Sequence, residues 1–189
     1  MKHAALFMTL CLALFASLPV VAAEGDDPPA KTKDGKDVTD YDALAKMRGD
    51  AKAGENVFRN AVGANCVQCH QIGGKGNMLG PPLDTIGEKP KEVLFESILK
   101  PSAAIQHGFE TWTVRLKSGE IKTGLITEDG EEQIILRTQD SKDNEIKTGD
   151  IAKRVKQEVS LMPEGLAGTM TLQELVDLVE WLSKQTANK

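Results

Sequence analysis

The chain has 189 residues, with 23 lysines and arginines against 28 aspartates and glutamates, so its formal net charge is −5. This length allows one domain of ordinary size with a real core rather than two. The acidic balance excludes a general attraction to nucleic acid or anionic lipid. Of three cysteines only two lie outside the N-terminal apolar segment, so the fold must be stable without disulfides or with another group in their place.

Residues 1–23 have the pattern of a secretory signal peptide. Lys2 is followed by an apolar run from Ala4 to Val21, and small residues precede a cleavage site after Ala23. A transmembrane anchor is the alternative, but the run is marginal in length and nothing basic follows it. We therefore expect an exported, periplasmic protein without a stable membrane anchor. Cys11 should leave with the signal, and losing Lys2 would make the charge −6.

Residues 24–48 are expected to form a disordered leader, because residues 24–40 hold six acidic and three basic residues and few apolar ones. The domain itself is placed at residues 49–187. Its first helix begins near Asp50, where Ala53, Val57 and Phe58 recur at helical spacing. Gly54 inside this helix suggests a close helix crossing.

Further along the chain, two more helices and one strand-rich segment are predicted. A helix over Lys91–Leu99 would start at Pro90 and stop at Pro101. Alternating residues and two glycine turns then predict strands within residues 110–157, forming a small curled sheet. The last helix runs from Leu172 to about Ser183 behind the capping box Thr171–Glu174. The predicted fold is mainly α with a β insertion.

The run "NCVQCHQ" at residues 65–71 has three possible chemistries. A structural zinc site needs four donors, and Cys66, Cys69 and His70 supply three. A redox dithiol normally lies in a strand and helix alternation, which is absent upstream. In C-x-x-C-H, by contrast, two thiols one turn apart can form thioethers to haem vinyl groups while the histidine ligates the iron. Covalently attached haem c is therefore predicted.

Several motifs together resemble one family: "GDAKAGENVF", "CVQCH", "GPPL", "LMP" and "ELVDLVEWL". The chain resembles a class I c-type cytochrome from about Gly49 to Lys184. It is most similar to the planctomycete-type haem-binding domain, of which "KPSAAIQHGFETWTV" at residues 100–114 is typical. The resemblance implies a class I helical fold with a β insertion between the middle helix and a methionine loop.

The resemblance also implies two contacts. Gly54 and Phe58 should meet Trp181 where the first and last helices cross. The carbonyl of Pro81 should accept the Nδ1 proton of His70, which would orient the ligating imidazole.

The sixth iron ligand must come from one of five residues: Met47, Met78, Met162, Met170 or His107. Met162 is favoured because Pro163 denies it a helical conformation and its loop leads into the last helix. His107 is the second choice, although its polar surroundings suit a surface histidine.

A six-coordinate iron predicts one-electron transfer between redox partner proteins rather than an enzyme. The alternative is a haem sensor or a peroxide-reactive enzyme in which Met162 leaves the iron. By family analogy, the partner would be a periplasmic dehydrogenase or a terminal acceptor. Nucleic acid is not expected as a partner, because residues 110–157 hold nine basic and ten acidic residues. The insertion could cover one haem edge and support the methionine loop, or it could serve as a docking face.

Overall fold

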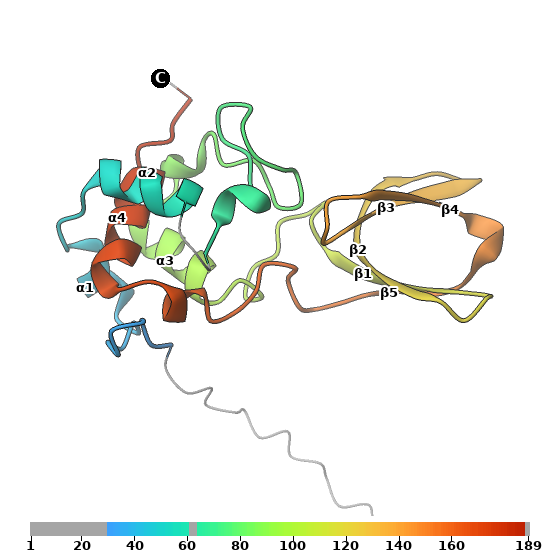
Figure 1. Cartoon of the computed structure of the whole chain (residues 1–189), viewed down its shortest axis with the longest axis horizontal. Helices are drawn as coiled ribbons and strands as arrows, with labels where there is room; N and C mark the ends of the chain where they lie inside the picture. Colours follow the sequence, from blue (N-terminus) through green and yellow to red (C-terminus); the bar gives the residue numbers. More distant parts are fainter. Residues whose placement is uncertain (1–29, 61–63, 188–189) are drawn as a thin grey trace, which may run out of the picture.

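The computed structural model describes residues 30–60 and 64–187, which form two parts at opposite ends of the molecule (Figure 1). The helical lobe consists of residues 30–99 and 162–187, apart from residues 61–63. The sheet module consists of residues 111–156. Two linkers, residues 100–110 and 157–161, run side by side between them (Figure 1). None of the helices among the described residues is long and apolar enough to cross a membrane.

Four α-helices build the helical lobe: α1 (Tyr41–Ala45), α2 (Ala51–Asn60), α3 (Lys91–Leu99) and α4 (Leu172–Leu182). The predictions for α3 and α4 are confirmed, and the Thr171–Glu174 capping box is formed in both directions. Pro90 is the residue before α3 rather than its first residue. At the start of α2, Asp50 Oδ1 accepts hydrogen bonds from the backbone of Lys52 and Ala53, as a helix cap does.

Helices α2 and α4 cross at very close range, as Gly54 suggested. A Cβ atom at Gly54 would lie 1.9 Å from the carbonyl oxygen of Asp177, so only glycine fits there. One turn further on, the rings of Phe58 and Trp181 pack with centroids 4.9 Å apart and planes tilted by 46°. The expected meeting of Gly54 and Phe58 with Trp181 is confirmed.

The segment before α2 differs from expectation. Val38 and Leu44 are buried in the core of the helical lobe, α1 packs against α3, and the backbone of Lys33 donates to Met170. The expected disordered leader over residues 24–48 therefore does not hold for residues 30–48. In this segment the many charged side chains are exposed, while a few apolar side chains are buried in the core. Composition alone does not reveal such an arrangement. Residues 24–29 and the expected signal at 1–23 lie outside the described residues.

Five antiparallel strands form the sheet module: β1 (Thr111–Leu116), β2 (Ile121–Asp129), β3 (Gln133–Thr138), β4 (Asp143–Lys147) and β5 (Ile151–Lys156). Their order is β4-β3-β2-β1-β5, and the sheet curls so that its two edges are joined by a short 3-10 helix, η3 (Thr148–Asp150) (Figure 1). The module has its own core of Val114, Ile134, Leu136 and Ile146. The prediction of a small curled sheet at this position is confirmed.

The description "mainly α" is wrong. Helix accounts for 31% and strand for 23%, so the described chain is a mixture of both. The reason is that the sheet is more than an insertion packed on the helical core. It encloses four buried apolar residues of its own and so forms a second, separate core rather than an extended loop.

Candidate haem site

The two cysteines and the histidine lie on one tight turn. Cys66 opens the 3-10 helix η1 (Cys66–Gln68), and its carbonyl accepts hydrogen bonds from the backbone of Cys69 at 3.1 Å and His70 at 2.9 Å. Asn65 enters the turn with φ +35°, a left-handed conformation that asparagine tolerates well. Both cysteines are free thiols. The predicted one-turn spacing is therefore present.

The thiols do not resemble those of a redox or zinc site. Burial raises the pKa of the Cys66 thiol to about 11, with a smaller contribution from nearby Cys69, and burial also raises the pKa of Cys69. Reactive dithiols need the opposite shift, since the thiolate is the nucleophile. The described residues also contain no group of three or more histidine, cysteine, aspartate or glutamate side chains placed to hold a metal ion. The C-x-x-C-H spacing therefore leaves thioether attachment as the chemistry best supported for these cysteines.

His70 is held in one orientation by Pro81. Its Nδ1 lies 2.8 Å from the Pro81 carbonyl oxygen, as expected, and a carbonyl can only accept, so Nδ1 must carry the proton. Burial lowers the pKa of His70, while the bond to Pro81 partly opposes that shift. The imidazole is thus neutral near pH 7, with Nε2 available to a metal.

The segment that carries Pro81 is built against the turn at residues 66–70, the candidate haem-binding turn. The backbone N–H groups of Leu79 and Gly80 both donate to the Cys69 carbonyl, at 3.1 and 2.7 Å. A Cβ atom at Gly80 would lie 2.5 Å from Cε1 of His70, closer than side chains approach one another. Gly80 therefore lets the chain pass directly beside the imidazole.

His70 faces a cavity that is mostly apolar. Its walls include Leu79, Leu83, Ile86, Leu94, Ile98 and Phe109. Of the predicted site residues, Cys69, His70, Pro81 and Met162 line this cavity. Cys66 is not among the lining residues and packs partly buried against the helical core beside them. No residue of the sheet module, 111–156, lines the cavity, so the idea that the insertion covers it finds no support among the described residues.

The five candidate sixth ligands differ in their exposure and in whether they line the cavity. Met170 is 1% exposed and belongs to the core, and Met47 packs against the same core. Met78 is exposed, and the side chain of His107 is fully exposed beside Glu110. Only Met162 of the five lines the cavity with His70.

Met162 is placed by the linker that follows β5. Its backbone N–H donates to Ser160 Oγ at 3.1 Å, and the backbone of Ser160 donates to Ser102 Oγ of the other linker at 3.2 Å. The methionine thus sits where the two linkers are bonded together.

Sequence reasoning missed the contribution of the linkers to the cavity wall. The first linker contributes Pro101, Ala104, Ile105 and Phe109, and the second contributes Leu161. The available signal was the presence of apolar residues in a segment with neither helical nor strand periodicity. Lys89, which also lines the cavity, was missed because nothing in its neighbourhood distinguishes it from other surface lysines.

Comparison with known families agrees with this geometry. Residues 51–120 match the family model described as "Cytochrome c". This supports a class I c-type cytochrome domain, whose covalently bound cofactor is haem c with iron. The residues present fit that group, because two thiols, a histidine with free Nε2 and an apolar cavity adjoin one another.

The match to that family covers the turn with both cysteines, the segment that carries Pro81, and α3, but not Met162. No curated protein matches the chain. The narrower resemblance to the planctomycete-type domain stays a prediction.

Proposed function

We propose that this protein is a periplasmic one-electron carrier whose haem iron is ligated by His70 and Met162. The observation that supports it best is that both side chains line one apolar cavity, with the Nδ1 proton of His70 held by Pro81. The match to the cytochrome c family supports electron transfer in general. The methionine ligand and the location are the steps proposed here.

When bound, haem supplies an iron that changes reversibly between the ferrous and ferric states. The chain contributes three things to that change. Pro81 fixes the tautomer and orientation of His70, so the imidazole need not move when the charge changes. Met162 provides a thioether, which favours the reduced state more than a second imidazole would. Apolar side chains keep water away and so limit reorganisation around the metal.

We propose electron transfer rather than catalysis because ligation by both His70 and Met162 would leave no open iron position for oxygen or peroxide. Among the described cavity residues, Lys89 and His70 are the only ionisable side chains besides Cys69. The partners would be redox proteins, with a periplasmic dehydrogenase or a terminal acceptor proposed by family analogy. A sensor with a labile Met162 is the alternative that the following experiment separates.

The test compares two methionine variants of protein matured in the periplasm. A pyridine haemochrome spectrum first measures covalent haem. Met162→Ala should abolish the weak ferric absorption at the red end of the spectrum and let carbon monoxide bind the reduced protein. Met78→Ala removes an exposed methionine from the loop on the His70 side and should change neither property. Rapid carbon monoxide binding by the unaltered protein would favour the sensor instead.

A further inference from the structure

The linkers that carry the sheet module are also walls of the cavity. The first linker, residues 100–110, contributes Pro101, Ile105 and Phe109, and the second leads from β5 directly to Leu161 and Met162. At the module end, the backbone of Gln157 donates to the Thr111 carbonyl. The position of the module therefore helps to determine where Met162 lies.

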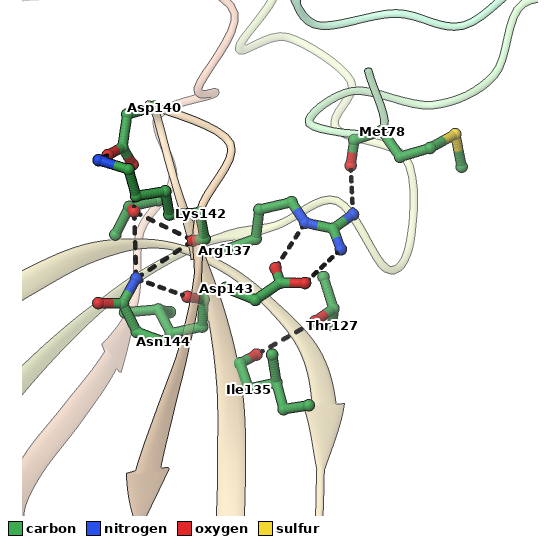
Figure 2. Close-up of polar contacts among 10 residues, drawn as sticks. Met78, Thr127, Ile135, Arg137, Asp140, Lys142, Asp143 and Asn144 are labelled. Atoms are coloured by element: carbon green, nitrogen blue, oxygen red, sulfur yellow. Dashed lines mark hydrogen bonds and ion pairs between the residues drawn. The ribbon is translucent and has the colours of Figure 1, made fainter. Parts of the chain in front are cut away.

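One side chain of the module also contacts the segment that carries Pro81. Arg137 on β3 donates two hydrogen bonds to Asp143 on the neighbouring strand, at 2.7 and 2.8 Å. Its remaining terminal nitrogen donates to the Met78 carbonyl oxygen at 3.3 Å (Figure 2). Because the paired carboxylate holds the guanidinium in place, this contact does not depend on a freely rotating side chain.

Met78 belongs to the segment that orients His70. The next residues are Leu79 and Gly80, which bond to the Cys69 carbonyl, and then Pro81, which accepts from His70. This segment is held firmly by the haem-binding turn. It therefore offers Arg137 a fixed point on the His70 side of the cavity, while the second linker holds the module on the Met162 side.

We infer that Arg137 is a positioning residue that fixes the sheet module against the His70 side and thereby keeps Met162 on the iron. This inference rests on the proposed ligation by Met162. Without the bond to Met78, the module can pivot about its two linkers. The second linker then holds Met162 less firmly, and an added ligand displaces it more easily.

The test measures imidazole binding to the ferric protein loaded with haem, using two arginine variants of the sheet. Arg137→Gln should raise the affinity for imidazole by about two- to tenfold, the effect expected from losing one ordinary, solvent-exposed hydrogen bond. Arg154→Gln is the matched control. It also breaks an arginine–carboxylate pair in the sheet, with Asp129 at 2.7 Å, but Arg154 has no such bond to the helical lobe in the described structure. It should leave the affinity unchanged.

Arg137→Lys and Met162→Ala complete the design. The lysine keeps the charge but cannot hold Asp143 with two bonds and reach Met78 together. The affinity of Arg137→Lys for imidazole should therefore lie between that of the unaltered protein and that of Arg137→Gln. Equal affinities for Arg137→Gln and Arg154→Gln would overturn the inference while leaving Met162 as the ligand. If Met162→Ala binds imidazole no more tightly than the unaltered protein, Met162 is not the ligand, and both proposals fail.

Discussion

The helical lobe and the sheet module each bury apolar side chains in a core of their own, but they differ in whether they line the cavity beside His70. The helical lobe buries a large core around the Phe58–Trp181 pair and still keeps a cavity beside His70. The sheet module curls around four buried apolar residues, and none of its residues lines that cavity. The proposed cofactor-binding residues therefore all belong to the helical lobe, and the linkers add to the cavity wall. The module can act on the site through those linkers and through the bond from Arg137 to the Met78 carbonyl.

The largest effect should come from the helix crossing. In Gly54→Ala the new Cβ would meet a backbone oxygen that belongs to α4 and cannot turn away. We expect the free energy of unfolding to fall by about 3 kcal/mol, at the upper end for overpacking. Thermal unfolding followed at the haem absorption measures this loss. Gly168→Ala is the control, since its Cβ would make only ordinary contact at 3.7 Å.

In the sheet module the corresponding experiment removes a buried side chain instead of adding an atom. Leu136 is fully buried in the small core, and Leu136→Ala should cost about 2 kcal/mol. Because the two cores are separate, hydrogen exchange should speed up in residues 111–156 while the helices α2 and α4 keep their protection. Ile121→Ala, on an exposed residue of the same sheet, should change neither. Equal loss of protection in both parts would show that they unfold as one unit.

Most of the helices and strands of both parts could be predicted from the sequence, because the signals for them are local. The capping box at Thr171, the stop at Pro101 and the glycine turns of the sheet each depend on neighbouring residues. The choice of Met162 also depended on its neighbour Pro163, and the structure places it alone of the five candidates in the cavity. That Met162 ligates the iron is still a prediction.

What sequence could not provide depends on distant contacts. The burial of Val38 and Leu44 requires helices that lie far along the chain, so a charged composition suggested disorder instead. The hydrogen bond from Arg137 to Met78 joins residues 59 positions apart, and the sequence around neither residue predicts it. Such contacts are properties of the assembled fold rather than of any segment.

A smaller effect is expected at the segment beside His70. In Gly80→Ala the added Cβ would press on the imidazole, which can yield slightly by lengthening its bond to Pro81. We expect a loss of about 1 kcal/mol in stability together with a shift in reduction potential, because a weaker bond makes the imidazole a poorer donor to iron. Potentiometric titration measures the shift. Gly149→Ala in the sheet module, where a Cβ meets nothing within 4 Å, should leave the potential unchanged.

The smallest effect concerns the surface of the helical lobe, where Glu180 of α4 pairs with Lys91 of α3 and with Lys184. Hydrogen bonds from Lys91 first, and then Lys184, lower the pKa of Glu180 below its ordinary value of 4.5. A carboxylate whose pKa is lower in the folded state stabilises the fold above that ordinary value and loses its contribution as the pH falls through the folded pKa. Because solvent screens these pairs, the contribution should be below about 1 kcal/mol.

Glu180→Gln should therefore lower the free energy of unfolding slightly at pH 7, with the difference from the unaltered protein disappearing in acid. Urea unfolding at a series of pH values, followed by circular dichroism, measures that difference. Glu158→Gln, on an exposed residue of the second linker, should follow the unaltered protein throughout. If the effect of Glu180→Gln persisted unchanged below the folded pKa, charge pairing between α3 and α4 would not be its cause. The packing of the helices alone would then account for their contact.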